Sequence, residues 1–277
     1  MSPDTSMTLS VFDALRRHAY DQAGIAIREN KQTLVAARIA KRMRACGIAS
    51  EREYLAFLER DRSGREMLEF LDAISTNFTS FFREPDHFGL LEEEVRGLAR
   101  RGATRLRIWC AAAATGEEPY SLAMTLAETL ERTPVEWKLL ASDISVSALR
   151  TAAAGCYPAS RVAQVPSALR SRYFETAPGR VGEDTNVRVK LDLRARILFK
   201  RVNLATPPFP VRGELDAVFC RNVMIYFDNA VRQRLVSELE RLLRPGGLLV
   251  VAHSETLSGV QTGLRIVRPS VYRKETA

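Results

Sequence analysis

Apolar residues in the first third of the chain recur every three or four positions, as they do on the buried face of a helix. One stripe runs through residues 12–20, and a second covers residues 34–46, where Gly47 would end the helix. Ser50, followed three positions later by Glu53, has the pattern of a capping box at the start of a third helix. A fourth helix is expected over residues 64–75. We therefore predict that the N-terminal part of the chain is all-helical.

From about residue 105 the pattern changes, and short apolar runs alternate with amphipathic segments. The turn formers Pro245-Gly246-Gly247 are expected to end the last of these helices. Strands that alternate with helices predict a parallel sheet covered on both faces, that is, an α/β domain. The expected strands are 106–110, 137–142, 197–202, 216–220, 248–252 and one over 265–272, and the expected helices are 118–131, 146–154 and 230–243.

Residues 156–193 interrupt this alternation. A small helix is expected at 166–174, and a Gly/Pro-rich turn follows at 178–182. Alternating apolar and polar residues over 187–191 then predict an exposed strand. We interpret this segment as a small antiparallel insertion on the main sheet, of the kind that often carries function.

Composition narrows the class of protein. The chain has 277 residues, of which 46% are hydrophobic, but no apolar stretch approaches the ~20 residues of a membrane span. Its start lacks a signal-peptide pattern, so we expect a cytoplasmic protein with no membrane insertion. The four cysteines and three histidines are scattered, with no CxxC pair, and we expect no metal. The formal charge of +8 suits an acidic partner, whose nature the charge alone does not decide.

Candidate ligand contacts follow the first two strands, since open parallel sheets bind ligands at the carboxyl ends of their strands. The second strand ends in Asp143, whose carboxylate can accept hydrogen bonds from two ribose hydroxyls. Small residues follow the first strand, and Glu117 and Glu118 come directly after them. The two carboxylates would repel a phosphate at this position, and the GxGxxG motif of dinucleotide-binding proteins is absent from the sequence. A ligand with an ammonium and a sulfonium, such as S-adenosylmethionine, fits better. The alternative is that both glutamates merely favour a helix N-terminus.

Two further segments carry polar side chains beside aromatic ones. In residues 75–84, Asn77, Thr79 and Arg83 would form a polar edge beside three phenylalanines. The simpler interpretation is that the phenylalanines are core and that Arg83 forms a surface ion pair. Residues 219–227 follow another strand and would face the reacting end of the ligand, although Tyr226 could equally be a half-buried core aromatic.

The second helix carries a basic face. Arg38, Lys41 and Arg42 lie away from its apolar stripe. This is either an ordinary solvated face or a docking surface for an acidic partner.

Seven segments, in order along the chain, resemble the CheR family of chemotaxis receptor methyltransferases. The segments are SxNFTSFFREPDHF (75–88), RIWCAAAATGEEPYSLAM (107–124), ASDIS (141–145), VNL (202–204), FCRNVMIYFD (219–228), RPGGLLVVAHSE (244–255) and VYR (271–273). The resemblance implies an α/β, Rossmann-like S-adenosylmethionine-dependent methyltransferase domain with an N-terminal all-helical domain and a small antiparallel β-subdomain insertion. We place these at residues 1–90 for the helical domain with its linker, 91–277 for the methyltransferase domain, and 156–193 for the insertion.

The resemblance also implies methyl transfer from S-adenosylmethionine to receptor glutamates, giving methyl esters and S-adenosylhomocysteine. It places Arg83 and Tyr226 nearest the transferring methyl, Asp143 on the ribose, and Glu118 or Glu117 near the methionine moiety. The basic face of Arg38, Lys41 and Arg42 would meet glutamate-rich cytoplasmic receptor helices, and we expect a monomer. The implied cofactor contacts are Asn77, Thr79, Arg83, Glu118, Asp143, Asn203, Leu204, Arg221 and Asn222.

Two alternatives remain open at the level of sequence. A methyltransferase of the same fold could act on nucleic acid or a small molecule, although no NPPY-type motif or stacking platform supports a nucleic-acid partner. A non-enzymatic module could keep the fold in order to sense the cofactor, and the presence of Arg83, Asp143 and Tyr226 argues against it. Whether the insertion grips a receptor tether stays undecided.

Overall fold

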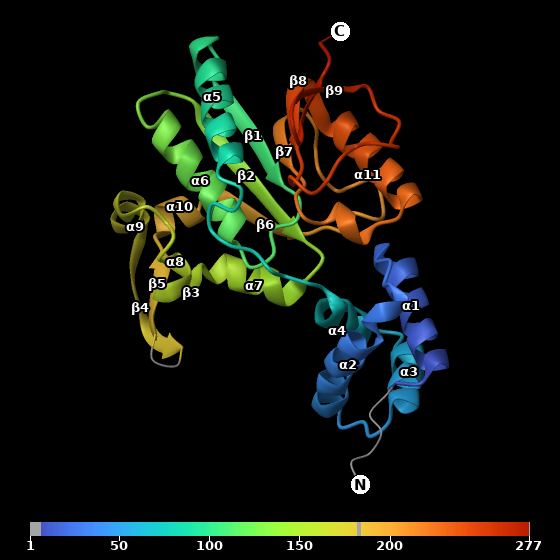
Figure 1. Cartoon of the computed structure of the whole chain (residues 1–277). Helices are drawn as coiled ribbons and strands as arrows, with labels where there is room; N and C mark the ends of the chain where they lie inside the picture. Colours follow the sequence, from blue (N-terminus) through green and yellow to red (C-terminus); the bar gives the residue numbers. More distant parts are fainter. Residues whose placement is uncertain (1–6, 182–183, 277) are drawn as a thin grey trace.

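The computed structural model describes residues 7–181 and 184–276 (Figure 1). The N-terminal part is helical, as predicted, and its helices enclose a core of their own that includes Phe12, Ile39 and Phe70. Gly47 ends a helix in the left-handed conformation, and the Ser50 side chain accepts the Glu53 backbone N–H. The elements are α1 (Leu9–Ala23), η1 (Glu29–Lys31), α2 (Gln32–Cys46), α3 (Glu51–Arg60) and α4 (Arg65–Ile74).

The second part is a seven-stranded sheet in the order β6-β2-β1-β7-β8-β10-β9. The pairs from β6 to β8 are parallel, and β10 pairs antiparallel with both of its neighbours. This is the doubly wound arrangement that the alternating pattern predicts. The strands are β1 (Arg105–Cys110), β2 (Glu136–Asp143), β6 (Ile197–Arg201), β7 (Leu215–Phe219), β8 (Leu243–Val250), β9 (Leu264–Arg268) and β10 (Val271–Lys274).

Helices cover both faces of this sheet (Figure 1). Along β1, Ile108 packs in the core with α5 (Asp86–Arg100) and α6 (Glu117–Leu130), whereas Trp109 packs in the core with α11 (Asn229–Leu242). The chain leaves β1 toward β2 and β6, then returns to β7 on the other side of β1. This reversal is the topological switch point, where such sheets bind ligands at the carboxyl ends of the strands.

The insertion differs from its prediction. It forms a separate three-stranded sheet in the order β3-β5-β4 rather than adding to the main sheet. Its apolar side chains explain why, since Tyr157 and Phe174 pack edge-on against Phe81 of the segment after α4 instead of against an edge strand. Residues 178–181 of the predicted turn lie within β4, and Gly182 lies outside the described residues. The elements are β3 (Cys156–Pro158), α8 (Ala159–Val162), α9 (Ser167–Tyr173), β4 (Phe174–Val181), β5 (Asp184–Val189) and α10 (Leu191–Arg194), the last in place of the expected end of the strand.

Near the C-terminus one prediction is confirmed and one is wrong. Helix α11 ends at Leu242, within one residue of the end expected before Pro245-Gly246-Gly247, and β8 begins directly with Leu243. The three residues lie in an irregular stretch of β8, where a Cβ on Gly247 would be 2.9 Å from the Leu215 carbonyl oxygen, so a glycine lets the two strands approach. The single strand expected over 265–272 is a hairpin of β9 and β10.

The boundary between the two parts also lies earlier than residue 90. Helix α5 runs through that position, and its residues Phe88, Leu91 and Val95 pack in the core of the main sheet. A division at residue 90 would split this helix from its own packing surface, so the helical part ends with α4. In the described part of the chain, no helix is both long and apolar enough to cross a membrane.

Candidate active site

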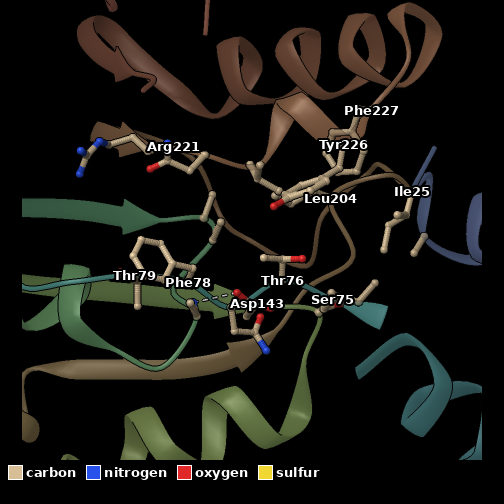
Figure 2. Close-up of a pocket in the computed structure, with 18 of the residues that line it drawn as sticks. Ile25, Ser75, Thr76, Phe78, Thr79, Asp143, Leu204, Arg221, Tyr226 and Phe227 are labelled. Carbon is tan, nitrogen blue, oxygen red and sulfur yellow. Dashed lines mark hydrogen bonds between the residues drawn. The ribbon is translucent and has the colours of Figure 1, made fainter. Parts of the chain in front are cut away.

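A pocket of about 860 Å³, adjoining open solvent included, lies at the carboxyl ends of β1, β2 and β7 (Figure 2). The helical part closes it from one side through Ala23, Ile25 and Ile74. The ten residues expected around the ligand all line it, namely Asn77, Thr79, Arg83, Glu118, Asp143, Asn203, Leu204, Arg221, Asn222 and Tyr226.

Asp143 ends β2 at the floor of the pocket. Its Oδ2 accepts the backbone N–H of Ala114 at 2.8 Å, and its Oδ1 accepts that of Ser145 at 2.9 Å. Burial raises the pKa of Asp143, and these backbone N–H groups partly offset the effect. The hydrogen bonds fix the carboxylate and still leave each oxygen a lone pair for a ligand donor.

The two glutamates at the start of α6 point in different directions. Glu118 lines the pocket, and its Oε2 lies 2.7 Å from Nη1 of Arg221. Glu117 instead pairs with Arg161 of the insertion at 2.6 Å and accepts from the Thr115 hydroxyl. The choice between Glu117 and Glu118 that the sequence left open therefore falls on Glu118 as the residue at the pocket.

Arg221 is fully buried and is held by protein groups. Besides Glu118, its Nη2 lies 2.9 Å from Oε2 of Glu84 and donates to the Arg83 carbonyl oxygen at 2.7 Å. Figure 2 shows its guanidinium turned away from the middle of the pocket. Burial raises the pKa of Glu118, and the Arg221 charge opposes that rise. Arg221 therefore acts chiefly by fixing Glu118 and the segment that follows α4.

The turn between β1 and α6 depends on Gly116. This residue has φ of 102°, and a Cβ there would lie 2.6 Å from the Tyr157 hydroxyl and 2.8 Å from the Ala152 Cβ. The same hydroxyl donates to the Thr115 carbonyl oxygen at 2.8 Å. The insertion thus packs directly on the turn that precedes Glu118.

The segment after α4 places Arg83 at the pocket without an acidic partner. Its guanidinium lies over the Phe78 ring, and its Nη1 donates to the Phe78 carbonyl oxygen at 3.3 Å. Among the described residues, no carboxylate lies within 4.0 Å of it. Phe78 is 74% exposed, whereas Phe81 is buried, so the three phenylalanines of this segment do not share one role. The surface ion pair considered for Arg83 is absent from this described part of the chain.

The opposite side of the pocket follows β6 and β7. Figure 2 places Tyr226 across the pocket from Asp143, and the Tyr226 carbonyl oxygen accepts the Ala26 N–H at 2.8 Å. The Asn203 side-chain N–H donates to the Gln22 carbonyl oxygen at 2.7 Å, and this hydrogen bond helps to hold the helical part in place. The neighbouring residue, Leu204, is buried at the pocket wall.

Asn222 adopts a positive φ of 58°, and its N–H donates to Glu255. Glu255 lies in one of the resembling segments but was not singled out as a site residue. Nor were Ala23 and Ile25, because nothing in a helix-end sequence shows which domain it will face.

The basic face of α2 is only partly free. Arg42 pairs with the buried Glu66 through Nη2 at 2.5 Å and Nε at 2.9 Å. Arg38 donates to the Ser75 carbonyl oxygen and to that of Ile74 at the end of α4. Lys41 and Arg44 are exposed. Of the three residues expected to bind a partner, Lys41 is the exposed one, and Arg38 and Arg42 are half-buried.

The fold and this pocket together define a Rossmann-like methyltransferase with a helical domain at the mouth of the ligand site. The chain belongs to the CheR methyltransferase family, whose SAM binding domain matches residues 77–272 and whose all-alpha domain matches residues 10–75. The division between the two matches agrees with the end of α4.

Similar proteins from three organisms cover nearly the whole chain. Chemotaxis protein methyltransferase 2 of Pseudomonas aeruginosa is 41% identical over 264 residues, covering 94% of this chain and 91% of that protein. The chemotaxis protein methyltransferase of Escherichia coli is 38% identical over 261 residues, covering 94% and 89%. That of Borreliella burgdorferi is 34% identical over 276 residues, covering 97% and 95%.

Proposed function

We propose that this protein transfers a methyl group from S-adenosylmethionine to glutamate side chains of methyl-accepting chemotaxis receptors. The products are glutamate methyl esters and S-adenosylhomocysteine. Family membership supports the reaction class, and one observation supports the acceptor: Arg83 is a cation at the pocket without a carboxylate partner among the described residues. An incoming carboxylate is the group that such an arginine would hold.

The pocket suits the methyl donor. Asp143 has lone pairs free for the ribose hydroxyls, and Leu204 offers a buried apolar wall for the adenine. Glu118 lines the pocket, where Arg221 holds it, and it offers a carboxylate oxygen to the ammonium of the methionine moiety. We assign Asn77, Thr79, Asn203, Arg221 and Asn222 the task of shaping and closing the same pocket.

The reaction needs few catalytic groups from the protein. The donor supplies an electrophilic methyl group, and a glutamate carboxylate is already ionised at neutral pH, so no general base is required. A carboxylate oxygen forms the new bond to the methyl carbon, while the carbon–sulfur bond breaks and its electron pair stays on sulfur. Arg83 orients the carboxylate, and the Tyr226 hydroxyl donates a hydrogen bond to one of its oxygens. Positioning of this kind can supply several kcal/mol, with about 7–11 as the upper range.

We further propose that the exposed cations of α2 guide the receptor to this pocket. Lys41 and Arg44 are exposed, and Arg38 lies between them and the pocket segment at Ser75. Glutamate-rich helices would be attracted in a salt-dependent way. Because such helices belong to the cytoplasmic parts of receptors, we place the enzyme in the cytoplasm, acting as a monomer.

The direct test is incubation with methyl-tritiated S-adenosylmethionine and receptor cytoplasmic fragments, followed by mild alkali. Carboxyl esters release volatile labelled methanol under these conditions. Methanol release from the receptor fragment, lost when its acceptor glutamates are replaced by aspartate or alanine, is the expected result. Label that is stable to alkali, or that enters RNA added to the same reaction, would contradict the proposal.

A further inference from the structure

Two histidines far apart in the sequence lie together on the side of Arg221 away from the pocket. The rings of His87, near the start of α5, and His253, just after β8, have centroids 4.6 Å apart. The three histidines are scattered along the sequence, but the fold brings this pair together. One nitrogen of each ring and one carboxylate oxygen of Glu84 lie within 4.8 Å of one another.

Only one ring nitrogen of His87 has a hydrogen-bond partner among the described residues. Its Nε2 lies 2.9 Å from the Ser270 hydroxyl oxygen, which in turn lies 2.6 Å from the Pro269 carbonyl oxygen. When Ser270 donates to that carbonyl, Nε2 donates to the Ser270 oxygen and Nδ1 presents its lone pair. This atom is buried without a hydrogen-bond partner, and it lies 3.4 Å from Oε2 of Glu84.

In this tautomer His87 Nδ1 and Glu84 Oε2 face each other as two electron-pair donors. Glu84 Oε2 already accepts from Arg221 and from the His253 N–H, whereas His87 Nδ1 has lost its water contacts and gained no hydrogen bond. A cation placed between the two atoms would give Nδ1 the partner that it lacks. The 3.4 Å separation also equals the spacing of two ligands about 2.0–2.1 Å from a tetrahedrally bound zinc.

We propose that Glu84, His87 and His253 form a binding site for a first-row transition metal ion of the Zn²⁺ type. Two imidazoles and one carboxylate are a common ligand set for such ions. His253 is half exposed and can rotate to shorten its distance to the other two, so an ion can enter from solvent.

The groups around the site favour a cation in sum. Asp86 Oδ2 lies 3.0 Å from Nε2 of His253 and adds a second carboxylate at the rim. Among the residues that the structure describes, Arg221 is the one Lys or Arg paired with Glu84, and its charge is shared with Glu118. Ser270 holds the outer nitrogen of His87, as partners of metal-binding histidines commonly do. Only Glu84 among the proposed ligands must divide its contacts between the ion and an arginine.

The test uses the full-length protein and the metal ions alone. Calorimetry should show one Zn²⁺ bound per chain, and Co²⁺ in its place should give the visible absorption of a four- or five-coordinate ion with nitrogen and oxygen ligands. His253→Ala and His253→Gln should each weaken Zn²⁺ binding by about tenfold or more and remove the Co²⁺ band. Circular dichroism would confirm that both variants are folded, as expected for a half-exposed side chain.

His18→Ala is the matched control, because His18 also lies beside a carboxylate, 3.2 Å from Glu59, but on α1 of the helical domain. It should bind Zn²⁺ as the unaltered protein does. Three results would overturn the proposal: no Zn²⁺ binding, equal affinity with and without His253, or a sulfur-to-cobalt charge-transfer band, which would place the ion at a cysteine. None of these readouts depends on methyl transfer, so the inference fails or stands apart from the proposed function.

Discussion

At the scale of single residues, Arg83 is the side chain on which the proposed chemistry most depends. Within residues 7–181 and 184–276 its guanidinium is held only by Phe78, through the ring and the carbonyl oxygen. We expect Arg83→Ala to lower kcat by about 100-fold, since loss of alignment at a reacting centre costs that much. S-adenosylhomocysteine affinity, measured by calorimetry, should be nearly unchanged.

Arg83→Lys serves as the control for charge. It should restore part of the turnover, because an ammonium attracts a carboxylate but cannot hold both of its oxygens in a fixed plane. Turnover of Arg83→Ala close to that of the unaltered enzyme, with the protein folded, would remove Arg83 from the mechanism.

Gly116 gives a second prediction at this scale. An alanine here must adopt φ near 102° and must also displace Tyr157 or Ala152. The backbone strain and the overpacking together should lower the free energy of unfolding by about 2–5 kcal/mol, measured by urea denaturation. Gly64→Ala is the matched control, since Gly64 also has a positive φ, of 68°, but nothing within 4 Å of the added Cβ. Its cost should be about 1 kcal/mol, and equal costs at the two sites would contradict the packing argument.

The sequence could place site residues at strand ends, but it could not separate neighbours there. Asp143 was predictable because it ends an apolar run that had to be a strand. Glu117 and Glu118 look alike in the sequence, yet successive helix residues point about 100° apart. Only the position of Arg161, set by the insertion, shows that Glu117 faces away from the pocket. The sequence also could not show the contact between His87 and His253, because only tertiary packing brings the two rings together.

At the scale of elements, one buried ion pair joins α2 to α4. Glu66 is 6% exposed, accepts from Arg42 and also accepts the Tyr54 hydroxyl at 2.8 Å. Arg42→Ala would leave this carboxylate buried without its cation. We expect the free energy of unfolding to fall by about 3 kcal/mol in a urea titration, at the low end for a broken buried pair because Tyr54 still donates.

Lys41→Ala, one position earlier on the same helix, should leave stability almost unchanged because Lys41 is exposed. If Arg42→Ala were as stable as Lys41→Ala, the pair would not hold the helices together. The apolar stripe of α2 correctly predicted a basic second face, but periodicity does not show which cations of that face find partners on another helix.

Helix and strand periodicity predicted most of the elements but not how the strands pair. The end of α11 before Pro245 was predictable, because a proline disfavours the helical conformation in the residue before it. The sequence did not show that Gly247 also belongs to β8, where a glycine lets the strand pass close to Leu215. The hairpin of β9 and β10 was read as one strand, because its turn is only two residues long, with Ser270 at a positive φ of 60°.

At the scale of the whole molecule, the pocket is completed only where the two domains meet. Asp72 of α4 accepts the Ser147 N–H at 3.2 Å, and the Ala26 N–H reaches Tyr226 across the other side. These contacts bind the helical domain to the strand ends around the ligand site. The position of the α2 surface relative to the pocket is therefore set by the fold, which gives the exposed cations a defined place from which to steer a receptor.

Charge reversal on α2 tests this steering. Lys41→Glu combined with Arg44→Glu should raise KM for a receptor fragment by about three- to tenfold at low salt, as expected when two exposed ion pairs are lost. The affinity for S-adenosylhomocysteine should not change, because neither residue lines the pocket. Reversal at Arg42 would be unsuitable, since it would place a second carboxylate against Glu66.

A charge-matched control separates steering from net charge. Lys138→Glu with Arg265→Glu removes the same charge from β2 and β9, and both side chains are at least 70% exposed. This double variant should leave KM for the receptor near that of the unaltered enzyme. The KM increase caused by the α2 substitutions should become smaller as the salt concentration rises. Salt screens exposed charges most strongly, and the Debye length is about 10 Å in 0.1 M salt. A KM increase of equal size in both double variants, or one that persists at high salt, would show that receptor capture depends on overall charge or on folding rather than on the α2 surface.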